Sequence, residues 1–362
     1  MINFLSRPLL AVVGSLFIVL CAMPAHGQRF MKPEIIEAES ITEDMSDEII
    51  ALVDPPLFDM SDEDVAPEEV KEAREQIQSF FRPTNASPAY LEALSKAISE
   101  RIGEAVGHDD PIVRMNAMIL IGLLVDDGSK ALIDKGLKDD NDAVQHWAMV
   151  ALGKRIQSWQ LKQAAGGARG IQAKIDAAIG QIKKLVLQET PPHTIVVSAA
   201  LESLVKVNTP MSREALIGIL NARVALHAAD PDLTYSPERS AVESFTNVLV
   251  GQVPPDMQSI KGYSQALGRY GALIVDQSKR NQLDPQLEKG AHAMLYLSLQ
   301  GLANVCAAAK APNSPPANHG QGRDWIKNAR WDDLNDLVVK DWGAILQAAP
   351  IGLNQQDLAV KP

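Results

Sequence analysis

One pattern constrains the fold of this chain more than any other: an acidic turn followed by an apolar, helix-forming segment occurs twice. The first copy starts at Asp109-Asp110-Pro111 and the second at Asp139-Asp140-Asn141. Three pairs of equivalent residues lie 31 positions apart: Val113 and Val144, Ala117 and Ala148, Gly122 and Gly153. Repetition at a fixed period is typical of stacked units, each of which buries its apolar face against its neighbour.

The rest of the chain after residue 86 has the same helical character. Ser87-Pro88 is an N-cap followed by proline at the first helical position, and an apolar stripe then continues to about Gly107. Nothing after it alternates with period two over the length of a strand, so we predict an all-α fold. Further helices are expected at about 158–188, with a break near 166–170, and at 211–228, 237–250, 256–280 and 285–309.

These residues resemble the HEAT-repeat, or armadillo-like, family. In that family an Asp-Pro-x-Val-Arg-like turn opens the second helix of each hairpin, and residues 108–125 match it well, 138–156 fairly and 191–207 faintly. The resemblance implies an irregular α-solenoid of HEAT-like antiparallel helical hairpins. It also implies that Asp109, Asp110 and Arg114 join neighbouring repeats, although Gln145 stands in the second unit where Arg114 stands in the first.

Changes of composition divide the chain into five segments. We predict a signal peptide at 1–27, an acidic and largely disordered arm at 28–86, the HEAT-like repeat domain at 87–309, a proline-rich linker at 310–322, and a C-terminal capping helix with its tail at 323–362. The capping helix is expected because Trp331, Leu334, Val338, Trp342 and Ile345 share one helical face.

The amino terminus indicates export. One charged residue, Arg7, precedes an apolar run from Leu9 to Met23, and small residues at Ala25 and Gly27 favour cleavage before Gln28. We therefore expect a periplasmic or secreted protein without a membrane span once the leader is removed. An uncleaved N-terminal membrane anchor is the alternative. Cleavage also leaves Cys306 as the only thiol, which excludes an internal disulfide.

The distribution of charge along the chain limits the kinds of partner that it can bind. Residues 28–80 hold 16 Asp/Glu and 4 Lys/Arg, a net charge of −12, whereas the remaining residues after 80 hold 29 of each. A chain with an acidic end and a neutral body has no basic stripe for a phosphate backbone, so nucleic acid is not an expected partner.

Motifs for catalysis and metal binding are missing from the sequence. There is no His-Glu-x-x-His and no Cys-x-x-Cys, and the six His residues after the leader are scattered, so neither a metal site nor a cofactor is expected. Gly262-Tyr263-Ser264-Gln265-Ala266 lies within an expected helix and lacks the strand that a nucleophile elbow requires. The sequence favours a protein without catalytic activity.

The leading hypothesis is therefore an exported scaffold that binds another protein through the concave face of the repeats. The residues expected to contact that partner are Arg114, Asn116, Gln145, His146 and Trp147. The alternative is an enzyme or small-ligand-binding protein with a pocket among the helices of 211–348. Such a pocket would bring together several of His227, Tyr235, Tyr263, Arg269, Tyr270 and His292.

Overall fold

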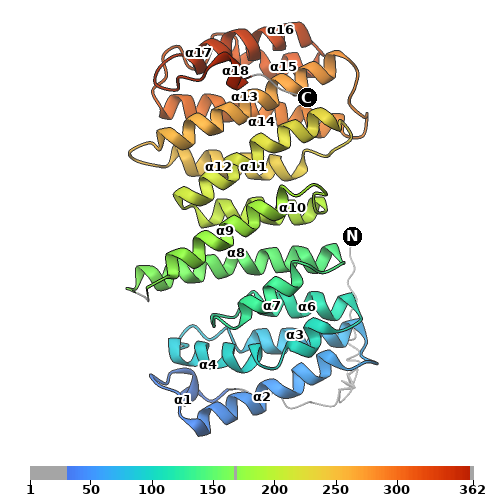
Figure 1. Cartoon of the computed structure of the whole chain (residues 1–362), viewed down its shortest axis with the longest axis vertical. Coiled ribbons are helices and arrows are strands. Elements are labelled where there is room, and N and C mark those ends of the chain that lie inside the picture. Colours follow the sequence, from blue (N-terminus) through green and yellow to red (C-terminus); the bar gives the residue numbers. More distant parts are fainter. Residues whose placement is uncertain (1–30, 167–168, 359–362) are drawn as a thin grey trace, which may run out of the picture.

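The protein is all-helical, as the sequence predicts. A computed structural model describes residues 31–166 and 169–358, and every regular element within these two stretches is a helix. Figure 1 shows the helices stacked along one long axis, from α1 and α2 at one end to the C-terminal helices at the other. The predicted signal peptide, 1–27, lies outside the described residues.

Apart from the 19-residue α2, the N-terminal half of the stack consists of helices of 13 residues or fewer. Their bounds are α1 Pro33–Ile36, α2 Glu43–Ser61, α3 Pro67–Ser79, α4 Pro88–Ser99, α5 Gly103–Gly107, α6 Pro111–Ile121 and α7 Ser129–Gly136. The predicted helix that starts after Ser87 is interrupted at 100–102, which separates α4 from α5.

Longer helices make up most of the remainder. They are α8 Asp142–Ala164, α9 Ile171–Val186, α10 Thr194–Val207, α11 Pro210–Ala229, α12 Ser236–Val250, α13 Met257–Lys279 and α14 Glu288–Ala308, followed by the short α15 Gly322–Lys327, α16 Trp331–Asn335, α17 Gly343–Gln347 and α18 Gln355–Leu358. A π-helical segment, Asp336–Trp342, joins α16 to α17.

The helices pack in two rows. Within each row, every helix contacts the next one. The first row consists of α3, α6, α8, α10, α12 and α14, and the second of α9, α11, α13 and α16. The rows contact each other through the pairs α8 with α9, α10 with α11, and α13 with α14. Small residues bring the first row close together: a Cβ added at Gly153 of α8 would lie 2.4 Å from Ser203 Oγ of α10.

Capping residues explain where the key helices begin. The Asp110 carboxylate accepts a hydrogen bond from Ile112 N at 2.7 Å at the start of α6. The Asn141 side chain accepts from Ala143 N at 2.9 Å at the start of α8. Both side chains satisfy backbone donors that a helix leaves unpaired in its first turn. The acidic turns recognised in the sequence are therefore helix starts.

The predicted disordered arm is wrong for the residues that the structure describes. Residues 33–36, 43–61 and 67–79 are helical, and α2 packs against both α3 and α4. Although α2 is acidic and contains Pro55-Pro56, its apolar residues form one stripe that is buried in the core. That stripe consists of Ile49, Val53, Leu57 and Met60, each at most 5% exposed. A narrow stripe at helical spacing suffices to dock a helix, even when every other face carries carboxylates.

The C-terminal segment closes the second row. α16, the π-helical segment and α17 all contact α13. Trp342 is fully buried, and Leu334, Val338 and Ile345 lie in the core with it. Trp331 is only partly buried. The predicted apolar face of this helix therefore packs against the last long helix of the second row.

Candidate functional site

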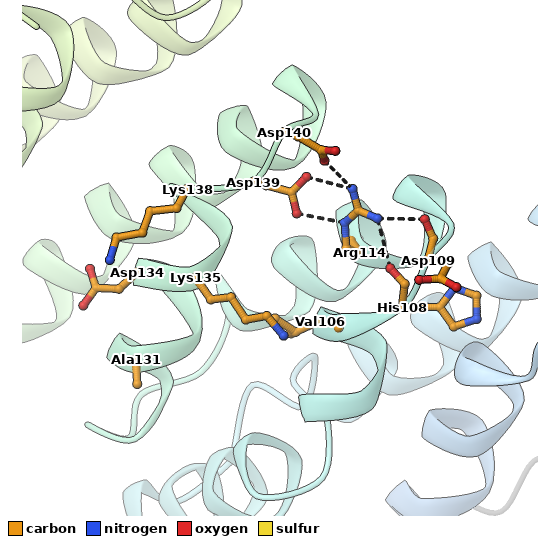
Figure 2. A pocket seen from close by; sticks show the side chains of 11 residues that line it. Val106, His108, Asp109, Arg114, Ala131, Asp134, Lys135, Lys138, Asp139 and Asp140 are labelled. Atoms are coloured by element: carbon orange, nitrogen blue, oxygen red, sulfur yellow. Dashed lines mark hydrogen bonds and ion pairs between the residues drawn. The ribbon is translucent and has the colours of Figure 1, made fainter.

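A charged cluster forms where α6 and α8 begin, around Arg114 (Figure 2). The guanidinium of Arg114 donates to both carboxylate oxygens of Asp139, at 2.8 and 2.9 Å, and to Asp140 at 2.9 Å. Its remaining donor group reaches two backbone carbonyls, those of His108 at 3.0 Å and Asp109 at 2.8 Å. Arg114 thus links the turn before α6 to the turn before α8, and all of its nitrogen atoms are used. Of the acidic residues expected to join the repeats, Asp109 contributes only its backbone carbonyl and Asp110 caps α6.

Electrostatics keep this cluster ionised. The hydrogen bonds that Arg114 donates to Asp139 raise the pKa of Arg114. Burial alone acts to raise the pKa of Asp139, but the hydrogen bonds from Arg114 and from Asn141 N outweigh it and lower that pKa. Burial therefore does not neutralise the pair.

The Arg114 cluster forms one wall of an open groove of about 820 Å³ between α5 and α7. Lys135 extends from α7 toward Val106 of α5, and Lys138, in the turn after α7, extends toward Asp134. Asp134, also on α7, is bonded to Lys130 at 2.5 Å and to Gln181 at 2.7 Å. Three carboxylates of the groove, those of Asp134, Asp139 and Asp140, are thus already paired.

Two of the predicted partner-binding residues serve the fold instead. Asn116 is 4% exposed and donates to the carbonyl of Ile112 in its own helix at 2.8 Å. A side chain buried in that way is not available to a partner, so this assignment is wrong in the observed conformation. Gln145 donates to the backbone carbonyl of Asp139 at 2.5 Å and stabilises the turn before α8. Since glutamine reaches only its own turn, the arginine contact is not repeated in the next unit.

His146 and Trp147 remain at the surface. Both are partly exposed, and their rings meet edge to face with centroids 5.3 Å apart. His146 Nδ1 lies 3.1 Å from the carbonyl oxygen of Ile195, the second residue of α10. Trp147 also packs against the hydrophobic core, so it contributes to stability while leaving part of its indole accessible.

A second arginine repeats the role of Arg114, and the sequence analysis missed it. Arg213 occupies the same position in α11 that Arg114 occupies in α6, four residues after the N-cap, with proline at the first helical position in both. It donates to Asp256, the N-cap of α13, at 3.0 Å, and to the carbonyl of Asn208 at 3.1 Å. The signal in the sequence is the likeness of Thr209-Pro210-Met211-Ser212-Arg213 to Asp110-Pro111-Ile112-Val113-Arg114.

A different kind of charged cluster is buried between α11 and α12. Glu238 is fully buried, and its Oε1 accepts from Arg223 Nε and from His227 Nε2, the latter at 3.0 Å. Burial by itself acts to raise the pKa of Glu238, but the hydrogen bond from His227 and the charge of Arg223 outweigh it. The net pKa of Glu238 is lowered.

Aromatic and amide groups enclose this buried cluster. Tyr235 stacks on His227 with ring centroids 3.9 Å apart, and Tyr270 meets both rings edge-on. Gln277 of α13 donates to the His227 carbonyl at 2.8 Å and accepts from Tyr235 Oη at 3.0 Å. Burial raises the pKa of both tyrosines. The phenols therefore stay neutral, and the network ties α11, α12 and α13 together.

Only some of the six residues expected to line the alternative pocket lie together. Of its six residues, His227, Tyr235 and Tyr270 converge, joined by Arg223, Glu238 and Gln277, which the sequence analysis did not identify. Each of these groups is at most 4% exposed. Tyr263 instead packs edge-on against Phe245, Arg269 bonds to Asn221 at 3.3 Å, and His292 lies beside Trp331.

Over residues 31–166 and 169–358, no group of three or more His, Cys, Asp or Glu side chains has the geometry to hold a metal ion. Within the same stretches, no helix is both long and apolar enough to cross a membrane. Cys306 is buried, and burial raises the pKa of its thiol to about 12.

Comparisons with other proteins add little. No protein-family model matches the chain, and no curated protein matches it. One solved structure that it resembles is an engineered protein of the Northeast Structural Genomics Consortium, at 18% sequence identity and a TM-score of 0.38. The match covers 70% of this chain and 97% of the engineered protein. A TM-score of this size supports no inference about fold or function.

Proposed function

We propose that the protein is an exported binding scaffold: an irregular α-solenoid of HEAT-like hairpins that engages another protein through its concave face, which we assign to the first row of helices. The two-row packing supports the solenoid interpretation, because each helix contacts mainly its neighbours along the stack. The two equivalent arginine contacts, Arg114 to Asp139 and Arg213 to Asp256, support a common repeat ancestry for distant parts of the chain.

One observation supports the proposed binding function. Across α6, α8 and α10, apolar side chains remain accessible on neighbouring helices of the first row: Ile112 is 36% exposed, Ile195 is 39% exposed and Trp147 is partly exposed. An aromatic residue held by the core at its base and open at its edge is typical of a hot spot in a protein interface.

Cross-linking in the native envelope tests this proposal. A photoreactive group placed at Ser198, which lies at the surface of α10 next to this face, should yield one specific cross-linked partner. Trp147→Ala should abolish that product, whereas Phe58→Ala, which removes a 70% exposed aromatic from α2, should leave it unchanged. Loss of the product in both variants, or in neither, would contradict the proposal.

Export is a separate part of the proposal and rests on residues 1–27. If the leader is cleaved as its sequence suggests, the mature protein begins at Gln28. Amino-terminal sequencing of protein from the native cell decides this, and recovery of the intact Met1 terminus in the membrane fraction would favour the anchored alternative.

The small-ligand alternative is favoured by the buried cluster around Glu238. Glu238 Oε2, His227 Nδ1 and Tyr270 Oη have no hydrogen-bond partner among the described residues, which is unusual for buried polar atoms. Native mass spectrometry of protein purified from its own source tests this idea. A stoichiometric adduct that is lost in Tyr270→Phe would support it, and the same mass with and without denaturation would refute it.

A further inference from the structure

The exposed face over α8 and α10 changes character along its length. The two helices run side by side: His146 reaches Ile195 near their starts, Gly153 touches Ser203 midway, and Gln160 donates to the Val207 carbonyl at 2.8 Å near the end of α10. A partner segment lying along this pair therefore meets each part of the face in turn.

The first half of this face is apolar. Trp147 and Val150 lie one turn apart on α8, both partly exposed and both packed against the core at their inner edges. Ile195, 39% exposed, lies at the start of the adjacent α10, where its carbonyl oxygen is 3.1 Å from Nδ1 of His146, the residue before Trp147. Accessible apolar side chains on two adjacent helices suit the apolar face of an amphipathic helix.

The second half is cationic. Lys154 follows Val150 by one helical turn and has no carboxylate within ion-pair distance among the described residues. Although Lys154 is exposed as a residue, partial desolvation of its ammonium group and the like charge of Lys206 on α10 lower the pKa of Lys154. Lys206 itself reaches Glu202 at 3.5 Å. The one carboxylate that pairs here, Glu202, thus serves Lys206 and leaves Lys154 without a partner in the part of the chain that the structure describes, and a carboxylate brought by a binding partner would relieve the repulsion between the two lysines.

From this charge complementarity we propose that the face over α8 and α10 binds an acidic amphipathic helix of the partner protein. Its apolar residues contact Trp147, Val150 and Ile195, and a Glu or Asp near one end pairs with Lys154. This inference rests on the proposed function and adds to it the chemistry of the partner.

Two synthetic peptides of about 15 residues, which as helices match the length of α10, provide the test. Both carry the same leucine positions, and one has glutamate where the other has lysine. Fluorescence anisotropy with the mature protein should show tighter binding of the glutamate peptide. Trp147→Ala should weaken it by about tenfold or more, as expected for an aromatic hot spot.

Lys154→Glu should lower the affinity for the glutamate peptide by about threefold to tenfold and reduce the salt dependence of its binding. The matched control is Lys184→Glu, which makes the same charge change at an exposed site on α9 and should have no effect. Circular dichroism of each variant shows whether it is folded; because Lys154 is exposed, its variant tests the proposal even if Trp147→Ala unfolds.

Equal binding of the two peptides, or unchanged binding by Lys154→Glu, would overturn the inference about the acidic partner. The scaffold proposal is tested separately, by whether the cross-link at Ser198 depends on Trp147.

Discussion

The Arg114 and Glu238 clusters use the same chemistry in opposite environments. At the start of α8, Arg114 is 14% exposed and one of its partners, Asp140, is 92% exposed, so water solvates part of the network. Between α11 and α12, the side chains of Arg223 and Glu238 are 5% and 0% exposed, and protein atoms alone must satisfy them. The first cluster can lose a member and be resolvated, whereas the second cannot. Burial, more than the number of bonds, sets how costly each substitution is.

The largest effect is expected at Glu238. Glu238→Ala leaves Arg223 as an uncompensated buried charge, so the free energy of unfolding should fall by about 3–5 kcal/mol. Urea denaturation followed by circular dichroism measures this. The matched control is Glu243→Ala on the exposed side of the same helix, which should change stability by less than about 0.5 kcal/mol. Similar losses in the two variants would contradict the contrast between buried and exposed groups.

The pH dependence of stability should report the ionisation of Glu238. Because the folded pKa of Glu238 lies below its ordinary value of 4.5, its contribution is complete above about pH 4.5 and is lost as the pH falls through the folded pKa. Unfolding free energies measured between pH 3 and 7 should therefore decline more steeply below about pH 4.5 in the wild type than in Glu238→Gln. Parallel curves for the two proteins would show that Glu238 does not titrate as an ionised group.

An intermediate effect is expected at Arg114. Arg114→Gln mimics the residue found at position 145 and removes the donors to Asp139 and to two carbonyls, so it should cost about 1–3 kcal/mol. Asp140→Asn removes only the exposed partner and should cost less than about 0.5 kcal/mol. Thermal unfolding of both variants measures the two losses of stability. A larger loss for Asp140→Asn than for Arg114→Gln would reverse the assignment of the buried carboxylate as the main partner.

The smallest effect is expected for an ion pair whose side chains are about half exposed. Arg330 and Asp333 are 2.7 Å apart, but their side chains are 53% and 39% exposed. Arg330→Gln should therefore change the unfolding free energy by less than about 0.5 kcal/mol, since solvent screens such pairs. A loss as large as that of Arg114→Gln would mean that distance, and not burial, governs these ion pairs.

Local pattern predicted much of the helical structure and part of the candidate site. The acidic turns, the caps at Asp110 and Asn141 and the apolar stripes are read from neighbouring residues, because helical spacing and capping are local properties. Arg114 was identified in this way. Arg213 was missed because its turn begins with Thr209 in place of an aspartate, although proline and arginine keep the same spacing. By contrast, Asn116 and Trp147 occupy similar sequence contexts, and only the packing of α6 against α8 decides that one is buried and the other accessible.

The sequence by itself determined that the chain is helical and that units around residues 113 and 144 repeat, since both follow from periodicity along the chain. Only the tertiary structure decided that α2 docks despite its acidic residues. Its stripe of four apolar side chains stabilises the fold only when another apolar surface of the protein buries it. The same holds for Glu238: the three helices that enclose it, and nothing in its neighbouring residues, make it a buried charge with two partners. Burial is a property of distant contacts, and no local pattern encodes it.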